Sequence, residues 1–170
     1  MKLADQVAIV TGAGRNIGEE TAKLFAAEGA AVAVVDMDRG RADRVAGAIV
    51  AAGGKAKAYL CDVSQEGQIV DTVKTVSADW GRLDILINNV AISDNKHLFD
   101  ITKEEWDRVF AVCLTAPMLF SKYAANPRSN QLDNGRRPQA RLRRSKSWTL
   151  GTTRLVAVAS RSASASSDPV

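Results

Sequence analysis

The stretch that decides the fold is QVAIVTGAGRNIG, residues 6–18. Residues 6–10 form a near-continuous apolar run, which is typical of a strand buried on both faces of a parallel sheet. The run ends at Thr11, and a helix with Gly29 as its C-terminal stop is expected from about Ile17. Three glycines lie between this strand and this helix or at the start of the helix: Gly12, Gly14 and Gly18.

A glycine-rich turn between a strand and a helix has a chemical use. Such a turn bends sharply, and its backbone N–H groups approach a pyrophosphate held at the positive end of the helix dipole. Side chains at the glycine positions would block that approach. The sequence therefore predicts a dinucleotide-phosphate site at residues 12–18. A tight turn without a ligand is the alternative, because three glycines alone are weak evidence.

Short β-branched runs and longer amphipathic stretches alternate through the rest of the first 125 residues, which predicts βαβ units and a parallel sheet. Strands are expected at residues 31–35, 55–61 and 83–87. Ser64 is expected to cap the helix that Gly81 ends. A Thr-x-x-Glu capping box at Thr102 and Glu105 predicts one further, long helix. The side chains expected to face inward from it are Trp106, Val109, Phe110, Cys113 and Leu114.

Asp36 follows the second expected strand and lies 18 residues after Gly18. A carboxylate at that position accepts hydrogen bonds from the adenosine ribose hydroxyls and repels a 2′-phosphate, which favours NAD over NADP. NADP stays open because the guanidinium of Arg15 or Arg39 is placed to reach a 2′-phosphate. The alternative reading of Asp36 is a helix N-cap, a role that Asp38 could also fill.

Five segments, in this order and at these distances, resemble the short-chain dehydrogenase/reductase family over about 125 residues. They are Thr11–Gly18, Asp36, Cys61-Asp62-Val63, residues 83–89 and residues 105–109. The resemblance implies a Rossmann-type, doubly wound parallel sheet of the α/β class, truncated, in strand order 3-2-1-4 with room for one further strand. It also implies an NAD(P)-dependent oxidoreductase that transfers hydride between the nicotinamide cofactor and a small alcohol or carbonyl substrate.

The resemblance also assigns cofactor contacts. Asp62 and Val63 match the family's Asp-Val pair beside the adenine ring, and Asn88 and Asn89 match the Asn-Asn pair that helps to hold the sheet and the cofactor. Without the family, Asp62 would be interpreted as a helix-capping aspartate and Asn89 as a turn residue. The full set of expected cofactor-binding residues is Gly12, Arg15, Asn16, Ile17, Gly18, Asp36, Asp62, Val63 and Asn89.

The chain departs from the family at several positions. Asn16 stands where the family usually has glycine, and asparagine tolerates a positive φ. Val90-Ala91 replaces the usual Ala-Gly, which adds methyl groups beside the cofactor. Cys113 stands where the family places the asparagine of its catalytic tetrad, and a thiol cannot make the amide's hydrogen bonds.

The family's catalytic Tyr-x-x-x-Lys pair is absent from the 170 residues. In that pair the tyrosine protonates the forming alkoxide and the lysine lowers the tyrosine pKa. Here Tyr59 is followed four positions later by Val63, and Tyr123 by Pro127. Ser160 superficially resembles the family's serine, but it lies 47 residues after Cys113, further than usual. We therefore assign no catalytic residue and expect impaired activity, with a non-catalytic dinucleotide-binding module as the alternative.

Charge divides the chain after Ala125 into an expected dinucleotide-binding domain, 1–125, and a tail, 126–170. The domain carries 14 Lys/Arg and 17 Asp/Glu, the tail 9 and 2. The composition of 126–146 predicts disorder or irregular structure, although 154–159 could add a strand. Translation in a shifted reading frame would produce such a break. Nucleic-acid binding through the tail is disfavoured, because Trp148 is its one aromatic residue.

Three further expectations concern the setting of the protein. The sequence lacks an apolar run of about 18 residues and a secretory leader, so a cytoplasmic protein without a membrane partner is expected. Cys61 and Cys113 have no Cys or His at metal-ligand spacing, which predicts reduced thiols and no metal site. The helix that begins near Thr102 lacks the later helices it would pack against, which predicts a homo-oligomer or aggregation.

Overall fold

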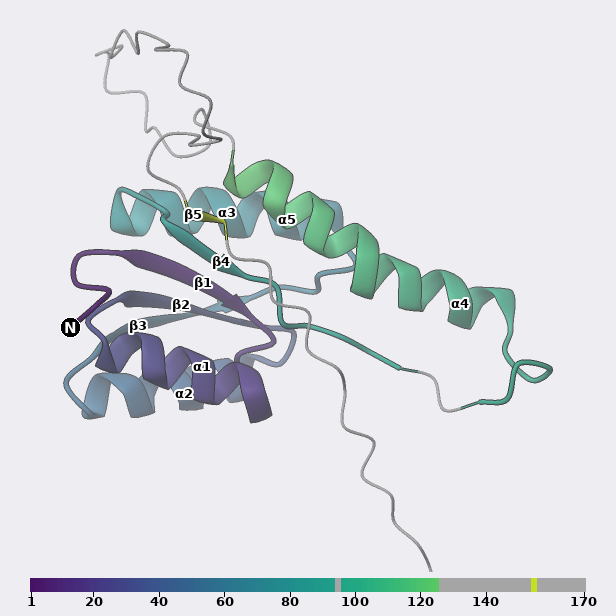
Figure 1. The fold of residues 1–170 in the computed structure, drawn as a ribbon, viewed down its shortest axis with the longest axis horizontal. Coiled ribbons are helices and arrows are strands. Elements are labelled where there is room, and N and C mark those ends of the chain that lie inside the picture. Colours follow the sequence, from purple (N-terminus) through teal and green to yellow (C-terminus); the bar gives the residue numbers. More distant parts are fainter. Residues whose placement is uncertain (94–95, 126–153, 156–170) are drawn as a thin grey trace, which may run out of the picture.

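The computed structural model describes residues 1–93 and 96–125, together with the backbone of residues 154–155. Within these residues one parallel sheet has the strand order β3-β2-β1-β4-β5 (Figure 1). The strands are β1 Val7–Thr11, β2 Ala31–Asp36, β3 Lys55–Leu60, β4 Ile85–Ile87 and β5 Arg154–Leu155. The predicted order, with one further strand, is confirmed. The rest of the tail, and Ser160 with it, lies outside the described residues.

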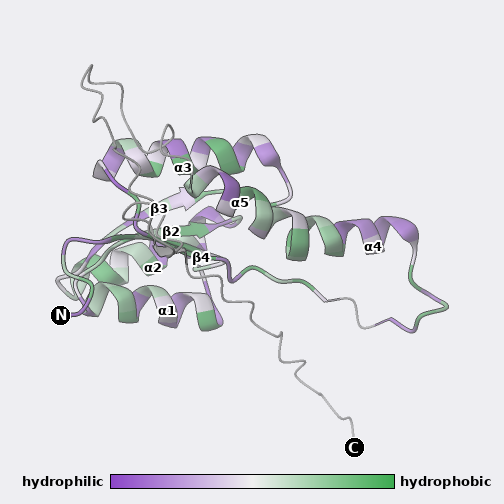
Figure 2. Cartoon of the chain, turned by 45° about the horizontal axis from the view of Figure 1, so that its top comes forward, coloured by the Kyte–Doolittle hydropathy of each residue, from purple (hydrophilic) through white to green (hydrophobic). Residues whose placement is uncertain are grey.

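Helices cover both faces of this sheet (Figure 1). On one face lie α1 Asn16–Ala27 and α2 Arg39–Ala51; on the other lie α3 Glu66–Trp80 and α5 Ala116–Ala124. α4 Lys103–Phe110 and the π-helical turn η1 Ala111–Thr115 continue directly into α5. The first half of this helical rod projects beyond the sheet, as both views show (Figures 1 and 2).

β1 is buried along its whole length, as its apolar run predicts. Alternate side chains serve the two faces, since Ile9 packs with α3 and α5 whereas Ala8 and Val10 pack with α1 and α2. At the N-terminal ends of the strands, the Asp84 carboxylate accepts a hydrogen bond from the Val7 N–H at 2.9 Å and so ties β4 to β1. The sheet is therefore held at the edge opposite to the glycine-rich turn.

The predicted helix ends agree with the structure in three places and fail in one. Gly29 and Gly81 have φ values of 96° and 73°, the left-handed conformation in which glycine ends a helix. The capping box of Thr102 and Glu105 is present. The prediction that Ser64 caps α3 is wrong: the N-cap is Gln65, and the Ser64 hydroxyl instead donates to the Asp62 carboxylate at 2.8 Å.

The prediction that the long helix turns its large apolar side chains inward is wrong for three residues. Trp106, Phe110 and Leu114 are 50%, 42% and 61% exposed. The part of the rod that carries them projects past the sheet, and the π-helical turn adds a residue that changes the helical phase. The residues of η1 and α5 that are buried instead are Val112, Ala116, Leu119, Phe120 and Ala124.

Candidate functional site

The carboxyl ends of four strands meet along one edge of the sheet. The register pairs Asp36 with Leu60, Thr11 with Val35 and Val10 with Ile87. The glycine-rich loop, the end of β2, the segment after β3 and the segment after β4 therefore lie side by side. In an open parallel sheet this edge, at the point where the strand order reverses, is where ligands bind.

Two glycines of the loop are required by contacts within the protein itself. A Cβ on Gly18 would lie 2.1 Å from the Gly12 carbonyl oxygen, and one on Gly14 would lie 2.6 Å from the Asp36 carboxylate. Gly12 has a φ of 63°. The loop thus packs closely on the first turn of α1 and on the end of β2, with no space for a side chain at either position.

The three residues that follow Gly14 are exposed: Arg15, Asn16 and Ile17. Asn16 has a φ of 51°, so the asparagine occupies the left-handed conformation for which the family uses glycine. Arg15 is the N-cap of α1, and its side chain makes no capping hydrogen bond. The N–H groups of the first turn of α1 are therefore not capped by this residue, which suits them to an anion.

The Asp36 carboxylate links the end of β2 to the loop. One of its oxygens accepts from the Gly14 N–H at 2.9 Å and the other from the Asp38 N–H at 3.0 Å, and the residue is buried. Each carboxylate oxygen can accept a second hydrogen bond. The helix-cap alternative for Asp36 is not what the structure shows, because Asp38 is the N-cap of α2 and accepts from the Arg41 N–H.

The arginines at the start of α2 have carboxylate partners. Arg41 Nε donates to Asp38 Oδ2 at 2.9 Å, and Arg39 lies 3.9 Å from Asp43. The backbone N–H and then the side chain of Arg41 lower the pKa of Asp38. The carboxylates of Asp38 and Asp43 therefore partly neutralise the positive charge of these arginines.

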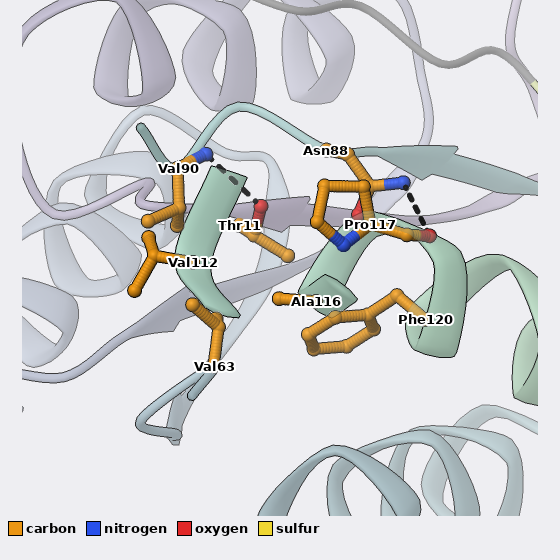
Figure 3. A pocket seen from close by; sticks show the side chains of 8 residues that line it. All are labelled: Thr11, Val63, Asn88, Val90, Val112, Ala116, Pro117 and Phe120. Carbon is orange, nitrogen blue, oxygen red and sulfur yellow. Dashed lines mark hydrogen bonds between the residues drawn. The ribbon is translucent and has the colours of Figure 1, made fainter. Parts of the chain in front are cut away.

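Asn89 and Asn88, the Asn-Asn pair, have different roles. The Asn89 side-chain amide donates to the Thr11 and Gly12 carbonyls at 3.0 and 3.3 Å, and the Asn89 N–H donates to the Thr11 hydroxyl at 3.0 Å. The Asn88 amide faces α5 instead, 3.5 Å from the Pro117 carbonyl (Figure 3). Asn89 therefore attaches the glycine-rich loop to β4, whereas Asn88 attaches the sheet to α5.

Val63 and Asp62 follow β3 and differ in exposure. The Val63 side chain is buried in a narrow, apolar hollow that leaves no room for a water molecule. Asp62 is half-buried, and its carboxylate accepts hydrogen bonds from the N–H and O–H of Ser64. The hollow is lined by Thr11, Val63, Asn88, Val90, Val112, Ala116, Pro117 and Phe120 (Figure 3).

The Cys113 thiol forms hydrogen bonds with the backbone of Ile92. Its Sγ accepts from the Ile92 N–H at 3.3 Å and donates to the Ile92 carbonyl at 3.2 Å. Both tyrosine hydroxyls are bound to carboxylates of α3: Tyr59 to Asp79 at 2.7 Å, and Tyr123 to Glu66. Burial, followed by the bond to Asp79, raises the pKa of Tyr59 well above its ordinary value. The two hydroxyls thus serve the packing of α3.

Sequence reasoning missed Glu19 and Arg44, which lie beside the loop. The Arg44 guanidinium donates to the Gly14 carbonyl at 3.0 Å and makes two hydrogen bonds to the Glu19 carboxylate. These residues are 25 positions apart and belong to different helices, so no local pattern signals their contact.

Among residues 1–93 and 96–125, no cluster of three or more His, Cys, Asp or Glu side chains could hold a metal ion, and no helix is long and apolar enough to span a membrane.

Comparisons with known proteins agree with this architecture. Residues 6–134 match the family model described as short chain dehydrogenase. Galactitol 2-dehydrogenase of Agrobacterium fabrum is 44% identical over 126 residues, which are 74% of this chain and 48% of that protein. Momilactone A synthase of Oryza sativa is 38% identical and matches 73% of this chain and 45% of that protein. The chain thus spans about half the length of these relatives.

Solved structures match a similar share of the chain. A metagenomic short-chain oxidoreductase in complex with NADP has a TM-score of 0.71 and 37% identity, covering 74% of this chain and 57% of that one. A short-chain dehydrogenase from Mycobacterium avium has the same TM-score and 36% identity, covering 74% of this chain and 46% of that one. With its parallel sheet, glycine-rich turn and matched family model, the chain belongs to the short-chain dehydrogenase family.

Proposed function

We propose that residues 1–125 bind NAD as the cofactor-binding half of an oxidoreductase that transfers hydride between the nicotinamide and an alcohol or carbonyl substrate. The Asp36 carboxylate carries the proposal, because it is fixed beside Gly14 by two backbone N–H groups and keeps acceptor capacity for ribose hydroxyls. The bound dinucleotide would supply the hydride acceptor or donor.

The residues present fit such a cofactor. The glycine-rich loop and the N-terminus of α1 offer N–H groups for the pyrophosphate, with Gly12, Gly18 and the exposed Arg15, Asn16 and Ile17 around it. Asn89 holds the loop in place from β4. Asp62 and Val63 follow β3, next to the end of β2, and we assign them to the adenine side.

We favour NAD over NADP. A 2′-phosphate beside the Asp36 carboxylate would bring two negative charges together, and Arg39 and Arg41 already have carboxylate partners. NADP is the second candidate, since Arg15 is exposed and one structurally similar oxidoreductase holds NADP.

We further propose that this chain is catalytically impaired. The sequence contains no Tyr-x-x-x-Lys, and the hydroxyls of Tyr59 and Tyr123 are bound to carboxylates of α3. Cys113, in the position of the tetrad asparagine, binds Ile92. These observations favour a second candidate, a dinucleotide-binding module without turnover. Cytoplasmic localisation and self-association are parts of the same proposal.

The experiment is a titration of the purified chain with NADH and NADPH by fluorescence, followed by a carbonyl-reduction assay. We expect saturable NADH binding, weaker NADPH binding and no turnover. Turnover would contradict the impairment. Absence of binding to a folded protein would contradict the dinucleotide assignment, and salt-sensitive RNA binding in that case would favour the basic tail as the functional element.

A further inference from the structure

Three charged side chains form a brace next to the glycine-rich loop: Glu19 and Lys23 on α1 and Arg44 on α2. Arg44 Nη2 donates both to the Gly14 carbonyl at 3.0 Å and to Glu19 Oε2 at 2.6 Å, while Nη1 donates to Glu19 Oε1 at 2.9 Å. Lys23 Nζ lies 2.7 Å from Glu19 Oε1. One guanidinium therefore joins the loop, α1 and α2.

Asp36 and the brace together hold the two peptide groups on either side of Gly14. The Gly14 N–H is held by Asp36 at 2.9 Å, and its carbonyl is held by Arg44 at 3.0 Å. Because the following peptide bond is trans and planar, the N–H of Arg15 points opposite to the Gly14 carbonyl. Arg44 thus orients the N–H of Arg15, the N-cap of α1, away from the Arg44 guanidinium.

The brace also neutralises a charge that would oppose an anion. Glu19 lies in the first turn of α1, the end of the helix at which a pyrophosphate is proposed to bind. An unpaired carboxylate there would repel the phosphates and cancel part of the helix dipole. The hydrogen bonds from Arg44 and then Lys23 lower the pKa of Glu19 to about 2, so the group stays ionised and paired.

We propose that Arg44 is a positioning residue for the phosphate-binding loop, acting through the Gly14 carbonyl and through Glu19 rather than by contact with the ligand. This inference rests on the proposed dinucleotide function. It identifies a determinant of phosphate affinity on α2, separate from the glycines and from Asp36.

The test compares a phosphorylated and an unphosphorylated ligand. ADP and adenosine compete against NADH for the wild-type chain, for Arg44→Gln and for Lys103→Gln, which removes an exposed ion pair with Asp107 on α4. We expect Arg44→Gln to weaken ADP binding about fivefold to tenfold, as removal of a charge near a helix terminus does, and to change adenosine binding less than about twofold. Lys103→Gln should change neither.

A second variant separates orientation from charge. Adding Glu19→Gln to Arg44→Gln removes the carboxylate that has lost its guanidinium partner and should restore part of the ADP affinity, whereas a merely structural role predicts further loss. Equal ADP affinity in Arg44→Gln and the wild type, or equal losses of affinity for ADP and adenosine, would overturn the role of Arg44 but leave the dinucleotide function standing. If the folded wild-type chain bound neither NADH nor ADP, the dinucleotide function would fail and this inference with it.

Discussion

At the scale of single residues, Gly18 in the loop and Gly47 in α2 differ in what surrounds them. Gly18 faces the Gly12 carbonyl so closely that a Cβ would lie 2.1 Å from it, whereas a Cβ on Gly47, inside α2, would meet nothing within 4 Å. The requirement at Gly18 is therefore packing of helix on loop, which applies with or without a ligand.

We predict opposite effects for two alanine substitutions. Gly18→Ala forces the loop and α1 apart and should lower the free energy of unfolding by about 3 kcal/mol. Gly47→Ala should raise it by about 0.5–1 kcal/mol, because alanine favours a helix interior. Urea unfolding followed by circular dichroism measures both. A Gly18→Ala protein as stable as Gly47→Ala would contradict the described loop.

Asp36 is predicted to decide between the two dinucleotides. Asp36→Asn keeps a side-chain oxygen but removes the charge, and should reduce the preference for NADH over NADPH about tenfold, the value of a charge-assisted hydrogen bond. Asp107→Asn, which removes an exposed carboxylate of α4, is the matched control. Fluorescence titrations give both dissociation constants, and an unchanged ratio in Asp36→Asn would refute the role assigned to this carboxylate.

Glu19 gives a pH dependence with a defined sign. Its pKa is lowered from 4.5 to about 2, first by Arg44 and then by Lys23, so its stabilisation is complete above pH 4.5 and is lost as pH falls toward 2. The free energy of unfolding of the wild type should exceed that of Glu19→Gln by about 1 kcal/mol at pH 7, a value reduced because Arg44 is exposed. This difference should shrink below pH 4.5. Urea unfolding at pH 7, 4 and 3 measures it, and a constant difference would be the contrary result.

At the scale of elements, the sequence predicts the sheet well because its signals are local. The apolar run of β1 is buried on both faces, and Gly29 and Gly81 end their helices. Ser64 does not cap α3, because the carboxylate of Asp62, two residues earlier, accepts hydrogen bonds from its N–H and its hydroxyl. The prediction that the rod from α4 to α5 buries its large apolar side chains fails because periodicity identifies an apolar face but not the neighbour that covers it.

The candidate site shows the same division. The loop and Asp36 are recognisable from their spacing after strands, Asn89 is recognisable only through the family resemblance, and the structure places all three at one edge of the sheet. Arg44 and Glu19 are not recognisable, because each looks like an ordinary charge on an exposed helix face. Their contact depends on how α1 and α2 pack together, which only the tertiary structure specifies.

At the scale of the whole molecule, the projecting rod exposes apolar side chains. Trp106, Phe110, Leu114 and Met118, spaced four residues apart, are each at least 42% exposed. We predict self-association through this face, since exposed apolar surface of this kind is typical of interfaces. Phe110→Glu should shift sedimentation toward the monomer, while Lys103→Gln should not. A monomeric wild type at micromolar concentration would contradict the prediction.

The composition break after Ala125 also belongs to this scale. We propose that the tail reflects a shifted reading frame, since basic residues outnumber acidic ones 9 to 2 there, against 14 to 17 in residues 1–125. Translating the gene downstream of the Ala125 codon in the other two frames tests this directly. A Tyr-x-x-x-Lys segment in one frame is expected, and its absence from both would argue against the shift.

We propose above all that the Gly12–Gly18 loop and Asp36 bind a dinucleotide. The most direct measurement is the ¹⁵N–¹H correlation spectrum of the chain during titration with NAD⁺. We predict saturable shifts of the amide resonances of Gly12, Gly14 and Arg15 and of the Asp36 segment, with the amides of α4 unaffected. A dispersed, folded spectrum in which these loop amides do not move at saturating NAD⁺ would contradict the account.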